Sequence, residues 1–108
     1  MGRRTELLKG TLDVLILKTL DLEPRHGVAI ADRIAQMTGG TFVVKPGSLF
    51  PALHRLEEDG LIEGGWSRST EGHRTKTYRL TPAGRRQLAE EKRQWLRIVT
   101  AMRQVLES

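Results

Sequence analysis

Cysteine is absent from the 108 residues of this chain. Without it neither a disulfide framework nor a thiolate metal site can form, and a thiol redox switch is excluded. The histidines His26, His54 and His73 lie in three different segments, and none has a partner at metal-ligand spacing. A glycine-rich stretch at 38–41 lacks the lysine of a phosphate-binding loop. The sequence therefore predicts no catalytic residue, no metal site and no cofactor, which disfavours an enzyme.

Long apolar runs are also missing. The longest uninterrupted run, from Val14 to Leu17, is far too short to cross a bilayer. Arg3 and Arg4 near the N-terminus are not followed by the apolar core of a signal peptide. We therefore expect a cytoplasmic protein with no membrane partner.

Positive charge is in excess, since 18 lysines and arginines face 13 aspartates and glutamates, a net charge of +5. Such an excess favours anionic partners, nucleic acid before a membrane surface, although it is common among unrelated soluble proteins. The length suffices for one folded unit with a modest core.

The segment 45–60 has the pattern of a short capped helix. Ser48 is placed to cap the first turn with its side-chain oxygen, and Gly60 is placed to end the helix in the left-handed conformation. One face is an apolar stripe and the other is polar and aromatic. A helix of this kind fits a DNA groove, but any amphipathic helix has the same pattern, so the neighbouring segments must decide. The stripe consists of Leu49, Leu53 and Leu56, and the opposite face of Phe50, Pro51, His54, Arg55 and Glu58.

Two helices and a strand are expected before this segment. Residues 9–22 predict a helix that is apolar on more than one face, which favours a second subunit as part of its cover. A turn at 23–27 and a second helix at 28–37 follow. The β-branched and aromatic residues at 41–44 predict a short strand.

A basic β-hairpin is expected after Gly60. Strand-like residues at 61–68 and 74–80 flank a polar stretch that contains a glycine. Lysine and arginine occur at sheet edges to discourage edge pairing. The functional alternative is a basic wing that contacts phosphates or enters a minor groove. Between 66 and 79 the cations are Arg68, Arg74, Lys76 and Arg79, against the single acidic residue Glu71.

The remaining residues predict one long helix from Pro82 to about Leu106. Thr81 is placed as the N-cap, and Pro82 suits the first helical position because it has no N–H to satisfy. A helix of roughly 37 Å is too long for the preceding residues to cover, so its apolar side chains favour a two-fold dimer. The expected dimer interface consists of Leu12, Ile16, Leu88, Trp95, Ile98, Val99, Met102, Val105 and Leu106.

The order helix, helix, short strand, capped helix, basic hairpin is that of a winged helix-turn-helix domain. Five sequence motifs narrow the assignment to a family. They are LKGTLDVLIL at 8–17, RHG at 25–27, GSLFPALHRLE at 47–57, GLI at 60–62 and YRLTPAG at 78–84. With these motifs in this order, residues 7 to about 88 resemble the PadR family of bacterial transcriptional regulators. The single terminal helix resembles the short subfamily.

The predicted fold class is α+β, mainly α, with a winged helix-turn-helix domain at 1–81 and a C-terminal dimerisation helix at 82–108. The resemblance implies a homodimeric, nucleoid-associated repressor that binds a palindromic operator in double-stranded DNA and that, in many members, an effector releases. Two residues depart from the family pattern. Phe50 stands where a tyrosine is usual, and Val28 where an aromatic is usual, so neither position offers a hydroxyl to a phosphate.

The expected DNA contacts lie on the outward face of the capped helix and on the wing. The acidic residues at 57–59 would repel phosphates, so the first two turns of the helix should approach the DNA. Arg55 fits a guanine edge, a phosphate or a salt bridge to Asp59, and Arg74 is the strongest wing candidate. The expected DNA-binding residues are Lys45, Ser48, Phe50, Pro51, His54, Arg55, Arg68, Arg74 and Lys76.

Trp95 has two interpretations. It is an apolar anchor of the dimer interface or, by resemblance to relatives that bind flat compounds there, the platform for a planar aromatic effector. The main alternative function is a winged-helix module that binds protein instead of DNA. That alternative predicts a neutral or acidic wing, whereas this wing is basic.

Overall fold

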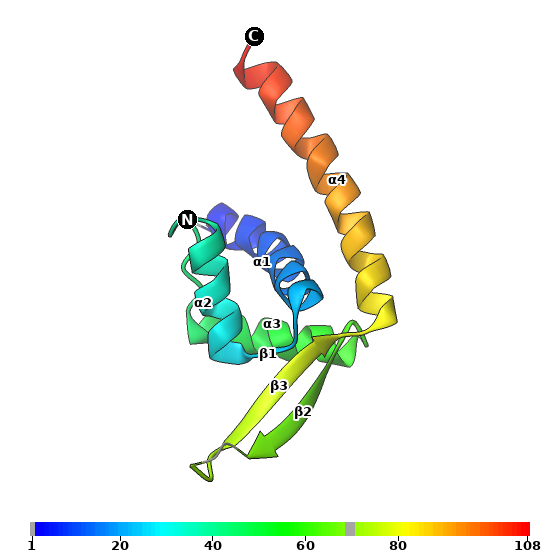
Figure 1. The fold of residues 1–108 in the computed structure, drawn as a ribbon. Coiled ribbons are helices and arrows are strands. Elements are labelled where there is room, and N and C mark those ends of the chain that lie inside the picture. Colours follow the sequence, from blue (N-terminus) through cyan, green and yellow to red (C-terminus); the bar gives the residue numbers. More distant parts are fainter. Residues whose placement is uncertain (1, 69–70) are drawn as a thin grey trace.

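The computed structural model describes residues 2–68 and 71–108, with side chains described from Gly10 onward. The described elements form a mainly helical fold around a small antiparallel sheet (Figure 1). In chain order they are α1 (Gly2–Leu22), β1 (Arg25–His26), α2 (Gly27–Met37), α3 (Pro46–Glu58), β2 (Ile62–Arg68), β3 (Arg74–Leu80) and α4 (Pro82–Leu106).

The sheet has the strand order β1-β3-β2. The hairpin of β2 and β3, called the wing below, pairs from Ile62↔Leu80 to Arg68↔Arg74, as the alternating sequence predicts. The third strand lies elsewhere than expected: β1 falls in the predicted turn and pairs with β3. The strand predicted at 41–44 is wrong, because β1 already occupies the free edge of β3. Phe42 and Val44 instead pack against the core from a loop.

The core lies where α1, α2 and α3 meet the inner face of the sheet. Ile16 is fully buried among these elements and Leu88 is 4% exposed, although both were expected at the dimer interface. The reason is that α2, α3, β3 and the first turns of α4 cover α1 from several sides. Leu12 is partly buried and packs against the same core. The core residues are Ile16, Leu17, Leu20, Ile30, Ile34, Leu49, Ala52, Leu53, Leu56, Ile62, Tyr78, Leu80 and Leu88.

Helix α3 begins three residues earlier than predicted, since its N-cap is Lys45 and not Ser48. Lys45 makes no side-chain cap bond, and Pro46 occupies the first turn. Proline already has the helical φ and lacks only an N–H that would be unpaired there. Ser48 therefore lies inside the helix, and its predicted capping role is wrong. The end is as predicted: Gly60 has a φ of +73°, and the N–H of Leu61 donates to the carbonyl of Leu56 at 3.0 Å.

Helix α4 starts where the sequence places it. Thr81 Oγ1 accepts from the Gly84 N–H at 3.0 Å and donates to the Gly60 carbonyl at 2.7 Å. A Cβ on Gly84 would lie 2.0 Å from the Leu61 carbonyl oxygen, so glycine permits this close approach. Beyond Leu88 the helix extends away from the other elements, along a molecule 57 Å in its longest dimension (Figure 1). None of the helices in the described ranges is long and apolar enough to cross a membrane.

Candidate nucleic-acid interface

The outward face of α3 exposes apolar and polar side chains together. The ring of Phe50 is 46% exposed. Its inner edge packs on α2, since a Cβ on Gly27 would lie 2.9 Å from Phe50 Cε1. Pro51 and His54 are exposed on the same helix. The close packing on Gly27 holds the aromatic ring against α2 while half of its surface stays free for a ligand.

The N-terminal end of α3 is open to solvent. Lys45 and Ser48 are both exposed there. A helix N-terminus carries a partial positive charge and favours anions such as phosphate. These two residues therefore lie where a phosphate contact is electrostatically favourable.

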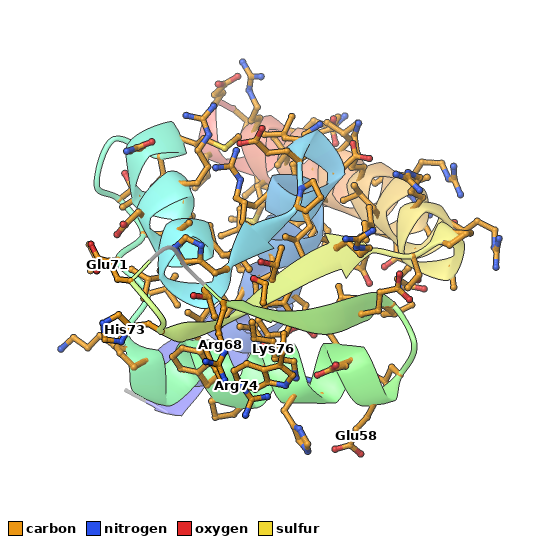
Figure 2. All side chains as sticks on the ribbon, turned by 60° about the horizontal axis from the view of Figure 1, so that its bottom comes forward. Glu58, Arg68, Glu71, His73, Arg74 and Lys76 are labelled. Atoms are coloured by element: carbon orange, nitrogen blue, oxygen red, sulfur yellow. The ribbon has the colours of Figure 1, made fainter. Side chains whose placement is uncertain are left out.

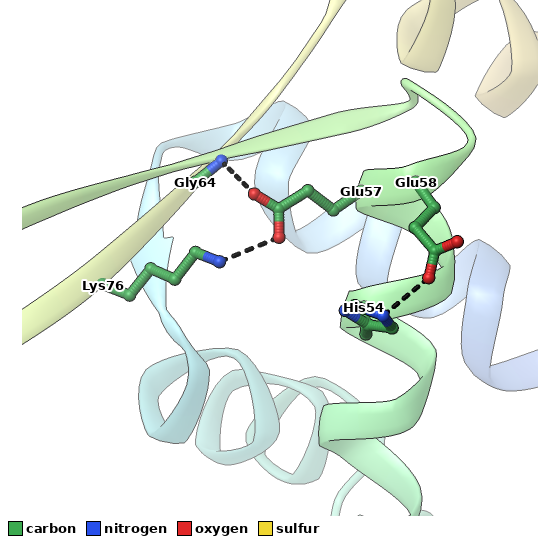
Figure 3. A network of polar contacts seen from close by, with 5 residues as sticks. All are labelled: His54, Glu57, Glu58, Gly64 and Lys76. Atoms are coloured by element: carbon green, nitrogen blue, oxygen red, sulfur yellow. Dashed lines mark hydrogen bonds and ion pairs between the residues drawn. The ribbon is translucent and has the colours of Figure 1, made fainter.

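The C-terminal part of the same face carries a contact between a histidine and a carboxylate. His54 Nε2 lies 2.6 Å from Glu58 Oε1, one turn further along α3 (Figure 3). Both side chains are mostly exposed. The carboxylate thus stands beside the imidazole and makes this end of the helix less attractive to phosphates than its start.

Arg55 is held from inside the molecule. Its guanidinium donates to the carboxylate of Asp13 on α1, and its side chain is 36% exposed. The salt bridge to Asp59 considered from the sequence is therefore wrong, since the partner comes from another helix. The pair ties α3 to α1 and leaves Arg55 only partly available to a ligand.

Three basic side chains of the wing lie on one face of the hairpin, namely Arg68, Arg74 and Lys76 (Figure 2). Of these, Lys76 reaches α3, where it bonds Glu57. Arg68 and Arg74 are paired directly across the strands, an arrangement of like charges that is unfavourable unless an anion compensates it. The Arg74 guanidinium lies over the Trp66 ring, 4.6 Å from the centroid, which restricts its motion. The wing therefore presents two exposed arginines close to each other.

The positive charge of Lys76 is compensated by a carboxylate of the same chain. Its Nζ lies 2.8 Å from Oε1 of Glu57, and Oε2 of the same carboxylate accepts from the Gly64 N–H at 3.2 Å (Figure 3). The hydrogen bond to Lys76 is the main cause that lowers the pKa of Glu57, and the same bond raises the pKa of Lys76. Lys76 also lies near the rings of Trp66 and Tyr78. It differs in this from Arg68 and Arg74, which are more exposed.

The apolar stripe of α4 continues beyond the part that its own chain covers. Leu88 is buried and Trp95 is half-buried, whereas Ile98, Val99 and Met102 are 44–53% exposed. Val105 and Leu106 are each 73% exposed. With about 100° per residue, Trp95, Val99, Met102 and Leu106 share one face with Leu88. This half of the helix is an apolar surface without a cover from the described residues.

Sequence patterns missed several residues that shape this site. Asp13 and Trp66 were not considered for it, and Glu57 was considered only as a charge that repels phosphate. For Trp66 a signal existed, because the hairpin register places it opposite Lys76. For Asp13 and Glu57 the sequence carries no such signal, since their partners lie on other elements.

An exposed helix of a helix-turn-helix unit, flanked by a β-hairpin with basic residues, defines a winged-helix DNA-binding protein. The model of the transcriptional regulator PadR-like family matches residues 16–90. The chain belongs to this family. Its members are DNA-binding transcriptional regulators, so this chain is a regulator of that class and not an enzyme.

Individual relatives agree with this assignment. The transcriptional regulator Rv3488 of Mycobacterium tuberculosis is 50% identical over 50 residues, which are 46% of each chain. A PadR family transcriptional regulator from Eggerthella lenta has a similar structure, with a TM-score of 0.82 and 31% identity over 99% of this chain and 91% of that one. A PadR-like regulator from Bacillus cereus has a TM-score of 0.81 and 30% identity over 95% and 98%.

Proposed function

We propose that the chain is a homodimeric repressor that binds a palindromic operator in double-stranded DNA. The observation that carries the proposal is the common placement of the exposed α3 face and the wing cations, Arg68 and Arg74, on neighbouring elements. In this arrangement α3 enters a major groove while the wing contacts the adjacent backbone.

The residues divide by role. Phe50, Pro51 and His54 face base edges, where the Phe50 ring suits contact with a thymine methyl group. Lys45 and Ser48 at the start of α3, with Arg68 and Arg74 on the wing, contact phosphates. Arg55 and Lys76 are engaged by Asp13 and Glu57 and contribute mainly to the shape of the interface.

Dimerisation follows from the uncovered stripe of α4. Each large apolar side chain that a partner covers contributes about 1.5–3 kcal/mol at full burial, so the apolar side chains of α4 beyond Leu88 that the chain leaves partly or mostly exposed favour association. A two-fold dimer presents two copies of α3 to two half-sites. The expected interface therefore omits Ile16 and Leu88, which are buried in the core, and keeps Leu12, Trp95, Ile98, Val99, Met102, Val105 and Leu106.

Fluorescence anisotropy tests the DNA-binding proposal. A labelled duplex from the region upstream of the chain's own gene is compared with a shuffled duplex of equal composition over a salt series. We expect preference for the upstream duplex and, if a dimer neutralises about six phosphates, a slope of log affinity against log salt near −5. Equal affinity for both duplexes at every salt concentration would contradict operator binding, and no binding at all would favour a protein partner.

A further inference from the structure

One carboxylate connects α3 to both strands of the wing. Glu57, in the last turn of α3, accepts from the Gly64 N–H of β2 at 3.2 Å and from Lys76 Nζ of β3 at 2.8 Å (Figure 3). The side chains of Glu57 and Lys76 are 29% and 25% exposed, so the pair is partly shielded from solvent. Ion pairs that are both hydrogen-bonded and partly shielded hold their geometry better than exposed ones.

The close approach depends on a glycine. A Cβ on Gly64 would lie 2.3 Å from Lys76 Cε and 3.1 Å from Glu57 Oε2. A side chain at this position would require the flexible end of Lys76 to move from its present place beside the carboxylate. At the neighbouring Gly65, an added Cβ would meet no atom within 4 Å. The close contact is therefore specific to the place where α3 and the wing meet.

The charges of Glu57 and Lys76 do not increase DNA affinity directly. A carboxylate near a phosphate backbone lowers affinity, and Lys76 is occupied by that carboxylate. What the three groups provide is a fixed distance between the end of α3 and the middle of the wing. Arg74 lies two residues from Lys76 on the same strand face, and Arg68 is its cross-strand neighbour, so a bond at Lys76 anchors the strand segment next to both arginines.

We propose that Glu57, Gly64 and Lys76 form a latch that fixes the wing against α3, so that Arg68 and Arg74 meet phosphates of the duplex that α3 reads. They are positioning residues and not DNA contacts. The inference rests on the proposed DNA-binding function, because it assigns part of the affinity to the orientation of the wing.

Two substitutions test the latch. Each removes one negative charge near the end of α3 with little change in side-chain shape. Glu57→Gln places an amide NH₂ or a weaker acceptor at Lys76, whereas Asp59→Asn removes the same charge at an exposed residue two positions further along the chain. Electrostatics alone predicts tighter DNA binding for both variants. The latch predicts opposite signs: Asp59→Asn binds more tightly, and Glu57→Gln binds about tenfold more weakly. The Glu57→Gln salt slope should also flatten by about 0.9 for each phosphate that the wing no longer reaches.

A second pair of variants changes no charge. Gly64→Ala should displace Lys76 and weaken DNA binding about as much as Glu57→Gln does, while Gly65→Ala should bind like the parent.

Two substitutions of Lys76 complete the set. Lys76→Arg keeps the ion pair with Glu57 and should retain most of the DNA affinity, whereas Lys76→Met removes the pair and should lose affinity. Thermal unfolding of each variant shows whether the fold is intact. Tighter binding by Glu57→Gln, or equal binding by the two alanine variants, would overturn the latch.

A measurement without DNA separates this proposal from the proposed function. In the free protein, hydrogen exchange at the Gly64 amide should be slow and should accelerate in Glu57→Ala, because the acceptor is removed. If the parent binds DNA but the variants behave alike, the latch fails alone. If the parent binds no DNA, the proposed function fails, and the exchange rates still show whether Glu57 holds the wing.

Discussion

A charge placed on the apolar stripe of α4 should dissociate the proposed dimer. Met102 is 53% exposed, so its own chain covers about half of it and a partner would cover the rest. Met102→Asp removes that apolar burial, about 1 kcal/mol, and places a carboxylate in an apolar environment. Each copy therefore costs about 2 kcal/mol or more. Because a two-fold dimer contains two copies, association should weaken by roughly a thousandfold.

Gln104→Asp is the matched control. Gln104 is exposed on the same helix, but it lies about 160° around the axis from Met102. The substitution introduces the same charge on the face opposite the stripe. It should leave association unchanged within about threefold.

Sedimentation equilibrium over a hundredfold range of protein concentration measures the outcome. The parent and Gln104→Asp should have twice the mass of one chain, and Met102→Asp the mass of one chain at concentrations where the parent is dimeric. Far-UV circular dichroism should show equal helix content in all three proteins. A parent that sediments as a single chain, or a Met102→Asp variant that associates like the parent, would refute the assignment of this stripe as the interface.

Three further predictions concern the wing and the start of α4. Arg74→Ala should reduce the slope of log affinity against log salt by about 2 in magnitude, since each chain of a dimer then neutralises one phosphate fewer. The preference for one DNA sequence over another should change little. An unchanged slope in the salt titration would remove Arg74 from the interface. Thr81→Ala should lower the free energy of unfolding by about 1 kcal/mol, because the Gly84 N–H no longer has its cap acceptor. Urea denaturation measures this change. A urea midpoint equal to that of the parent would contradict the capping role of Thr81. The Glu57–Lys76 pair should stabilise the fold between two pH limits. The lowered pKa of Glu57 makes its contribution complete above the ordinary value of 4.5 and lost as pH falls through the lowered value. The raised pKa of Lys76 makes its contribution complete below 10.5 and lost as pH rises through the raised value. Urea unfolding at several pH values should therefore show a difference between the parent and Lys76→Met that narrows at both extremes, and a difference independent of pH would contradict the pair.

Local patterns in the sequence determined most elements of this fold. Gly60 and the Thr81–Pro82 pair mark element ends through the backbone conformations they permit, and the structure places the end of α3 and the start of α4 there. The alternation at 74–80 predicted β3, and the uncovered heptad residues of α4 are visible in the sequence and in the structure alike. These features depend on residues within a few positions of each other, so a single sequence contains them.

The tertiary structure alone decided which groups meet. The residues at 41–44 have strand propensity, but the edge of β3 is taken by β1, so they remain a loop. Arg55 binds Asp13, 42 residues away, and not the carboxylate one helical turn away. Glu57 was expected only to repel DNA, but it bonds to both strands of the wing because α3 packs beside the hairpin. Such pairings depend on the angles at which helices and strands pack, and these angles follow from burying the whole core at once and not from any local spacing.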